Sequence, residues 1–142
     1  MRHIGIYSGT FDPVHAGHLA FADAAQRIGK LDYVVFMPEE QPRDKINVSA
    51  LEQRIGLLRS QLADTDHKIY HASHPRFSIA ETLPELVSQY QDTRFSFLIG
   101  SDIVPSLHKW PDIEQLLAQH RIIVGMRAND SQDATADTLD QL

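Results

Sequence analysis

Residues 4–18 constrain this chain more than any other stretch, because they combine three features of an anion site. Ile4 and Ile6 belong to a short apolar run, which predicts a buried strand at the start of the protein. Gly9 follows in a Ser-Gly-Thr turn, where it can take backbone angles closed to other residues. We expect a helix to begin near His15 or Ala16. The unpaired N–H groups and the positive dipole end of that helix would face the turn, which predicts a phosphate-binding site.

His15 and His18 lie three residues apart, so they share one face of the first helical turn. Gly17 between them leaves room for a ligand to approach the backbone. A helix-opening turn with two solvated histidines would explain either feature alone. The joint string G-T-F-D-P-x-H-x-G-H is more specific, and it favours a site that binds phosphate.

Composition limits the partners of such a site. The 142 residues suit one domain, and the net charge of −6 argues against a nucleic-acid surface. No apolar run reaches the roughly 18 residues of a membrane span, and the chain has no cysteine. We therefore expect a cytoplasmic protein without a membrane or nucleic-acid partner, in which a local cluster of donors holds any phosphate.

Apolar runs alternate with segments of helical periodicity, which predicts a βαβ series. The expected strands after the first are 33–37, 68–71, 95–99 and 121–125. The expected helices are 16–28 with Gly29 as C-cap and Ile28 facing inward, 51–62 behind a capping box at Ser49, and one ending near Tyr90 that begins at Ser78 or Thr82. These elements predict a Rossmann-like, doubly wound α/β fold, with a parallel five-stranded sheet and helices on both faces.

The fold would occupy residues 1–127, followed by a polar tail, 128–142, that we expect to be partly disordered. In such sheets ligands bind beyond the carboxyl ends of the strands. Residues 8–10, 38–45 and 100–102 all follow strands, so the glycine turn, a basic loop and an acidic residue should meet at one edge of the sheet.

The G-T-F-D-P-x-H-x-G-H string resembles the phosphate-binding signature of the nucleotidyltransferase superfamily, the adenylyl- and cytidylyltransferases with a His-x-Gly-His motif. Among these, the chain is most similar to the bacterial nicotinate-nucleotide adenylyltransferases. The residues that carry this closer resemblance are Pro13, His15, the Pro38-x-x-x-Pro42-x-x-Lys45 loop, the Ile99-Gly100-Ser101-Asp102 strand end and the Lys109-Trp110 pair.

The resemblance implies transfer of AMP from ATP to nicotinate mononucleotide, with release of pyrophosphate. It implies an ATP site made of Ser8, Gly9, Thr10, Phe11, His15, His18, Gly100, Asp102 and Arg127, of which His15 and His18 are the catalytic residues. It assigns Lys45, Thr82 and Trp110 to the acceptor. Mg²⁺ would be carried on ATP, without a dedicated protein site. A homo-oligomer remains open.

Two departures from the family keep other functions open. Ile79 stands where the family has a threonine that meets the pyridine carboxylate, and the family's Ser-x-Thr-x-x-Arg string does not occur in these 142 residues. The alternatives are an adenylyltransferase for another phosphorylated acceptor such as phosphopantetheine, a nucleotide-binding protein with weak or no turnover, or a protein–protein module. Arg127 or Arg43 would be the substitutes for the family's arginine.

A separate set of histidines, His67, His71 and His74, has the spacing of metal ligands on a helix. The segment reads instead as strand and loop, so a metal site is the less favoured interpretation.

Overall fold

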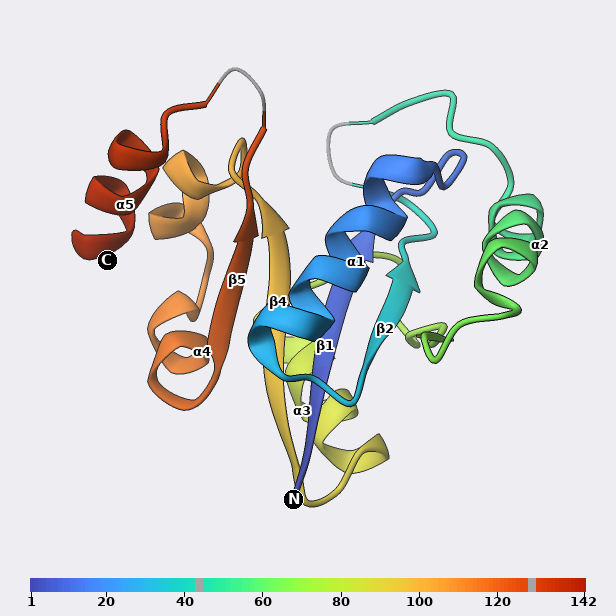
Figure 1. Cartoon of the computed structure of the whole chain (residues 1–142), viewed down its shortest axis with the longest axis horizontal. Helices are drawn as coiled ribbons and strands as arrows, with labels where there is room; N and C mark the ends of the chain where they lie inside the picture. The colour runs from blue at the N-terminus through green and yellow to red at the C-terminus, as the bar shows by residue number, and fades with distance from the viewer. Residues whose placement is uncertain (43–44, 128–129) are drawn as a thin grey trace.

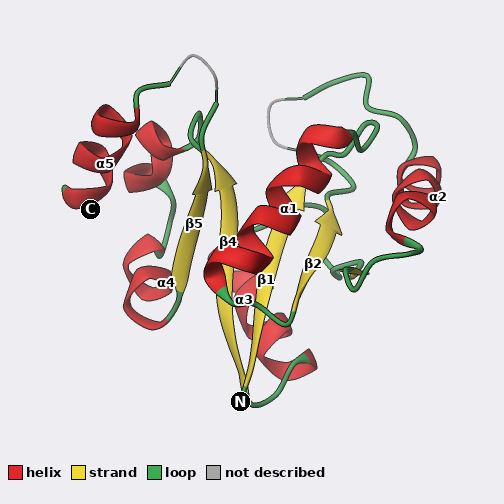
Figure 2. Cartoon of the chain, viewed as in Figure 1, coloured by secondary structure: helices red, strands yellow, loops and turns green. Residues whose placement is uncertain are grey.

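The computed structural model describes residues 1–42, 45–127 and 130–142. Its centre is a five-stranded sheet in the order β3-β2-β1-β4-β5, in which all neighbouring strands are parallel (Figure 2). The strands are β1 (Arg2–Gly9), β2 (Tyr33–Pro38), β3 (Lys68–Ile69), β4 (Thr93–Gly100) and β5 (Arg121–Gly125). The chain runs outward from β1 to β3 and then returns to the other side of β1, so the strand order reverses between β1 and β4. This confirms the predicted Rossmann-like fold, and the reversal point is where such sheets bind ligands.

Helices cover both faces of the sheet, as predicted (Figure 1). On one face, α1 (Ala16–Gly29) and α2 (Leu51–Leu62) bury Ala22, Ala25 and Leu58 against Val34 and Phe36. The opposite face carries α3 (Ile79–Gln89), the 3-10 helix η1 (Val104–Lys109) and α4 (Ile113–Gln119). The continuous apolar sequence of β2 follows from this double cover, because both faces of a central parallel strand are buried.

Two of the helix ends differ from the prediction. α1 ends one residue later than expected, since Lys30 and not Gly29 takes the left-handed C-cap conformation with φ 54°. Ile28 is 74% exposed and does not face inward. α2 has no capping box, because the Ser49 N–H donates to Asp12 Oδ2 at 2.9 Å and Ala50 becomes the N-cap.

For α3 the structure decides between the two predicted starts. Ser78 is the N-cap, and its hydroxyl accepts the Glu81 N–H at 3.2 Å. Pro84 lies inside the helix, where it has no backbone N–H to donate to the preceding turn.

The segment after Arg127, expected to be a polar and partly disordered tail, contains a helix that the sequence analysis did not assign. Residues Gln132–Asp140 form α5, capped by the Ser131 hydroxyl, which accepts the Ala134 N–H. α5 lies beside η1, and Leu139 packs against the core on that side of the sheet. The weak periodicity reflects its mostly solvated surface, since none of its residues is fully buried.

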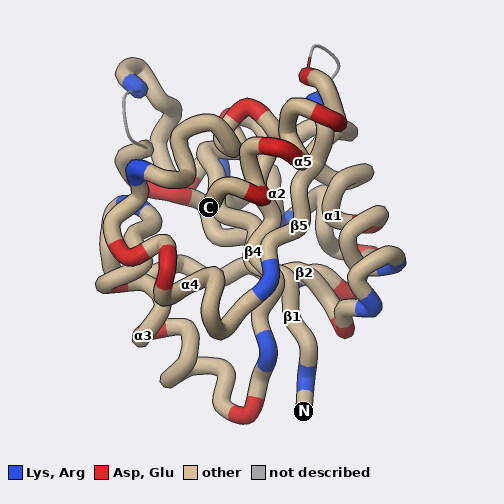
Figure 3. Tube along the Cα trace, turned by 90° about the vertical axis from the view of Figure 1, so that its left-hand side faces the viewer, with Lys and Arg blue, Asp and Glu red and all other residues tan. Residues whose placement is uncertain are grey.

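Charge is spread unevenly over the fold. Figure 3 shows acidic positions along α5, whose sequence contains Asp133, Asp137 and Asp140.

No helix within the described part of the chain is long and apolar enough to cross a membrane.

Candidate active site

A cavity of about 990 Å³ opens at the carboxyl ends of β1 and β4, where the strand order reverses. Its volume lies at the upper end of the range usual for ligand pockets. It brings together eleven of the twelve residues that the sequence assigned to the site: Ser8, Gly9, Thr10, Phe11, His15, His18, Lys45, Gly100, Asp102, Trp110 and Arg127.

Thr82 is the exception, and its assignment to the acceptor is wrong in this structure. Its side chain is fully buried in α3, and the hydroxyl accepts the Ser78 N–H at 3.0 Å. Thr82 therefore supports the first turn of the helix and does not line the cavity. Arg43, named as a substitute cation, lies outside the described residues, as do Ala128 and Asn129.

The turn after β1 is shaped by Phe11 more than by Gly9. Phe11 has a positive φ of 49°, while all the glycines of the chain have negative φ. The Phe11 ring is buried against Tyr7, 5.1 Å between ring centroids, and a Cβ at Gly9 would lie 3.1 Å from its Cζ. Gly9 is therefore needed for close packing and not for special backbone angles, which corrects the prediction. The peptide bond between Asp12 and Pro13 is cis.

His15 and His18 hold each other in place at the start of α1. Their rings stack with centroids 3.7 Å apart at 22°. His15 Nδ1 accepts the Gly17 N–H at 3.0 Å, and His18 Nδ1 accepts the His15 N–H at 3.1 Å. A Cβ on Gly17 would lie 2.9 Å from the His15 ring, so Gly17 makes room for that imidazole and not for a ligand.

These contacts determine where the histidine protons sit. A nitrogen that accepts a backbone N–H must carry a lone pair, so the neutral form of each ring keeps its proton on Nε2. The turn thus fixes His15 and His18 as Nε2–H donors at the cavity. Burial, with the nearby His15, Arg127 and Lys45 as smaller causes, lowers the pKa of His18 to about 4. His18 is therefore a neutral donor at pH 7.

Three cationic side chains line the cavity, Lys45, Lys109 and Arg127, and two of them have polar partners there. Lys45 Nζ donates to Thr10 Oγ1 at 2.9 Å, which places the basic loop against the glycine turn. On the other side, Arg127 Nε lies 3.2 Å from Asp102 Oδ1, and both side chains are more than half exposed. Because the protein as a whole is acidic, these local charges supply the attraction for an anion.

Gly100 and Ser101 keep the ion pair between Asp102 and Arg127 at the strand end. A Cβ on Gly100 would collide with Asp102 Oδ1 and lie 3.2 Å from Arg127 Nε. Ser101 is 2% exposed, and its hydroxyl accepts the Arg127 N–H at 2.7 Å while donating to Asp130. This role of Ser101 was not predicted from the sequence, although its place between Gly100 and Asp102 in the strand-end string was a usable signal.

The other end of the cavity is apolar and aromatic. Trp110 is half-buried, and its ring lies 6.1 Å from that of Phe77, with the planes tilted by 50°. Ile79 lines the same end. A flat ring could therefore contact Trp110 and Phe77 while a phosphate reaches the turn at the opposite end.

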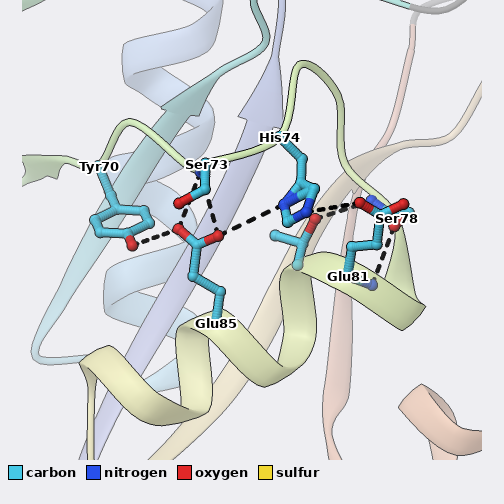
Figure 4. Close-up of polar contacts among 7 residues, drawn as sticks. Tyr70, Ser73, His74, Ser78, Glu81 and Glu85 are labelled. Carbon is cyan, nitrogen blue, oxygen red and sulfur yellow. Dashed lines mark hydrogen bonds and ion pairs between the residues drawn. The ribbon is translucent and has the colours of Figure 1, made fainter.

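A polar network after β3 holds the segment that carries this aromatic end (Figure 4). The Tyr70 hydroxyl donates to Glu85, which also accepts the Ser73 N–H at 3.1 Å. His74 Nε2 lies 2.7 Å from Glu81 Oε2. The hydrogen bond from Tyr70, together with the smaller contribution of Ser73, lowers the pKa of Glu85. The network fastens the segment to α3.

Two of the three histidines considered as metal ligands have other partners. His67 Nδ1 accepts the Val34 N–H at 3.1 Å, and its Nε2 lies 2.9 Å from Asp23, whereas His74 pairs with Glu81 on α3. Among residues 1–42, 45–127 and 130–142, no group of three or more His, Cys, Asp or Glu side chains has the geometry of a metal site.

The Rossmann-like fold and the phosphate-binding turn define a nucleotidyltransferase-like protein, and comparison with known proteins agrees with this class. The model of the Cytidylyltransferase-like family matches residues 6–139, and the chain belongs to that family. Among curated proteins, one from Lachnoclostridium phytofermentans is named "Probable nicotinate-nucleotide adenylyltransferase". It is 32% identical over 139 residues, which are 94% of this chain and 70% of the relative. A protein of the same name from Bacillus cereus is 36% identical over 124 residues, covering 82% of this chain and 65% of that protein.

The solved structures show the same fold. The nicotinic acid mononucleotide adenylyltransferase of Plasmodium falciparum, complexed with NaAD, superposes with a TM-score of 0.81 at 17% identity. The match covers 97% of this chain and 71% of that one. The chain thus spans about two thirds of the length of the relatives it matches.

Proposed function

We propose that this protein transfers the adenylyl group of ATP to nicotinate mononucleotide, giving the dinucleotide and pyrophosphate. One observation carries the proposal: a phosphate-binding turn with two Nε2–H donors opens onto the same cavity as an aromatic wall. The curated relatives named for this reaction, at 32% and 36% identity, support the choice of substrates.

The reaction needs no protein nucleophile. A phosphate oxygen of the mononucleotide attacks the α-phosphorus of ATP in line, the bond from the α-phosphorus to the bridging oxygen breaks, and pyrophosphate leaves with that electron pair. Catalysis then consists of positioning the two substrates and stabilising the charge that moves onto the leaving group.

The turn and the two histidines supply this stabilisation. Ser8, Gly9, Thr10 and Phe11 would contact phosphate oxygens, mainly through backbone N–H groups. His18 would donate from Nε2 to the α- and β-phosphates, with His15 beside it. Because His18 is neutral at pH 7 in the free protein, it would act as a neutral hydrogen-bond donor that stabilises the developing charge through Nε2–H.

The ribose and the outer phosphates would meet the other side of the cavity. Asp102 uses Oδ1 for Arg127, while Oδ2 makes no hydrogen bond to the described part of the chain. We assign Oδ2 to a ribose hydroxyl of ATP, with Gly100 allowing the nucleotide to approach. Arg127 would then face the triphosphate, because the same ion pair keeps its guanidinium at the cavity wall.

At the acceptor end, Lys45 would hold the mononucleotide phosphate and Trp110 would lie against the pyridine ring. The contact between Lys45 and Thr10 brings the acceptor phosphate next to the turn that binds ATP, which is the arrangement an in-line attack requires.

The donor set suits Mg²⁺ that arrives with ATP. The cavity offers N–H groups, imidazoles and cations to the phosphates, and it has no cluster of three potential metal ligands among the described residues. Mg²⁺ usually keeps several waters and binds through substrate phosphates, so it would be carried on the triphosphate and reduce its charge.

The apolar acceptor end also supports a second candidate, an adenylyltransferase for a different phosphorylated acceptor. Ile79 offers no hydrogen bond to a pyridine carboxylate, and the neighbouring Phe77 and Trp110 would accept any flat or apolar group.

An acceptor panel separates the two candidates. Pyrophosphate release from ATP is measured with nicotinate mononucleotide, with phosphopantetheine, and without acceptor. We expect release that depends on nicotinate mononucleotide. Release with phosphopantetheine alone would assign the second function, and ATP binding without release under any condition would identify a nucleotide-binding protein.

A further inference from the structure

Arg54 is the largest fully buried side chain among the residues that the structure describes, and the proposed reaction gives it no role. It lies on α2, is 1% exposed, and interrupts the apolar stripe of that helix. A buried guanidinium is normally paired with a carboxylate. No carboxylate lies within ion-pair distance of Arg54 in the described part of the chain.

Four backbone carbonyls take the place of that carboxylate. Arg54 Nε donates to Ser49 O at 2.8 Å, and Nη2 donates to Glu40 O at 3.2 Å. Nη1 donates to both Thr10 O at 2.9 Å and Glu39 O at 2.7 Å. The guanidinium therefore uses its planar fork of donors to bind main chain from three separate segments.

These segments are the phosphate-binding turn and the two ends of the loop between β2 and α2. Two further bonds join the same parts: Glu39 N–H donates to Gly9 O at 2.9 Å, and Ser49 N–H donates to Asp12 Oδ2 at 2.9 Å. The loop carries Lys45 to the cavity. Arg54 is thus the common point that connects the ATP-binding turn to the loop assigned to the acceptor.

The bond to Thr10 O has a direct consequence for the turn. The peptide bond between Thr10 and Phe11 is trans, so its carbonyl and its N–H point in opposite directions. With Thr10 O held by Arg54, the Phe11 N–H points away from the guanidinium. Phe11 lines the cavity, and its N–H is in none of the hydrogen bonds among the described residues.

We propose that Arg54 is a positioning residue for phosphate binding: it aims the Phe11 N–H at the substrate and fixes the Lys45 loop against the turn. The proposal rests on the proposed function, since it names what prepares that site. It also explains why an arginine and not a leucine occupies this place, because only a fork of donors can satisfy carbonyls from three segments at once.

The test uses two variants that separate geometry from charge. Arg54→Lys keeps the charge but loses the fork, and Arg54→Gln loses the charge but keeps two donors. Binding of ATP, inorganic pyrophosphate and adenosine is measured by calorimetry, after circular dichroism shows that each variant is folded. We expect at least a tenfold weaker affinity of both variants for ATP and pyrophosphate, with adenosine binding changed less than twofold.

Two control variants on α2 exclude simpler causes. Arg59→Gln removes an exposed charge from the same helix, and Leu58→Ala removes a buried apolar side chain that forms no hydrogen bond with the turn. Both should keep the parent affinity for ATP, although Leu58→Ala lowers the melting temperature. A folded Arg54→Lys protein with parent affinity for ATP and pyrophosphate would overturn the proposal, as would an equal loss of affinity in Leu58→Ala.

If neither Arg54 variant folds, the parent protein decides. Pyrophosphate is titrated while the amide resonances are followed by ¹⁵N–¹H spectroscopy. The Phe11 amide should shift among the most strongly of all, and an unchanged Phe11 amide at saturation would overturn the proposal. The outcomes also separate the two proposals: a parent chain that binds pyrophosphate but transfers nothing refutes the proposed reaction alone, whereas unaltered binding in the variants refutes the role of Arg54 alone.

Discussion

Replacing His18 tests the chemistry of the site most sharply, because this residue has two separable roles. Its Nδ1 accepts the His15 N–H and so caps α1, while its Nε2–H faces the cavity. His18→Ala removes both roles. His18→Gln keeps an acceptor at the third helical position, where glutamine is a normal partner in a capping box, and replaces the preorganised imidazole N–H by an amide group that the turn does not aim at the phosphates.

The two roles predict different magnitudes. Loss of one preorganised donor to a developing charge costs about 2.7–4 kcal/mol of barrier, a factor of roughly 100 to 1000 in rate. Loss of a cap costs about 1 kcal/mol of folding stability. We therefore expect both variants to lose at least about 100-fold in turnover, while only His18→Ala melts at a lower temperature.

The assay is pyrophosphate release at saturating ATP and nicotinate mononucleotide, beside a thermal melt of each protein. His15→Asn is the matched control for stability, since asparagine is a good N-cap and can still accept the Gly17 N–H. If His18→Gln turns over within threefold of the parent, His18 is no donor to the transition state and its proposed role is wrong.

Three further predictions follow from other parts of the site. Nicotinate mononucleotide should quench the fluorescence of Trp110, the sole tryptophan, and unchanged emission at saturation would leave Trp110 only its packing role. Gly100→Ala should weaken ATP binding by roughly 10- to 100-fold by displacing the Asp102 carboxylate, a charge-assisted contact of about 1.5–3 kcal/mol. Its melting temperature should stay close to the parent's, because Asp102 is exposed; parent affinity measured by calorimetry would contradict this. The hydrogen bond from Tyr70 is the chief cause that lowers the pKa of Glu85. The ionised Glu85 therefore stabilises the fold at pH values above the ordinary carboxyl pKa, and this stabilisation is lost as the pH falls through the lowered pKa of Glu85. Glu85→Gln should therefore unfold more easily than the parent in urea at pH 7 and show a smaller loss of stability on acidification, and equal urea midpoints at pH 7 would refute this.

The sequence predicted most of the site because its signals are local. The glycine turn, the start of α1 and the strand-end residue Asp102 each follow directly from a strand, and parallel strands bring their carboxyl ends to one edge. The predictions that were wrong within the site concern details of packing. The room beside Gly17 is used by the ring of His15, and the positive φ of the turn belongs to Phe11.

The residues that the sequence could not identify act through distant main chain. Arg54 sits in an apolar helical stripe, and its partner Thr10 is 44 residues away, so no spacing rule connects them. Thr82 has a hydroxyl that suits a ligand, but only the packing of α3 shows that it is buried. α5 lacks a strong apolar face because it rests on η1 chiefly through Leu139.

Identification of the product tests the central claim most directly. The protein is incubated with ATP, Mg²⁺ and nicotinate mononucleotide, and the products are resolved by mass spectrometry. The account predicts a dinucleotide that contains the adenylyl group of ATP, formed in equal amount with pyrophosphate and absent when the mononucleotide is omitted. Pyrophosphate without the dinucleotide, or no product from a protein that binds both substrates, would contradict it.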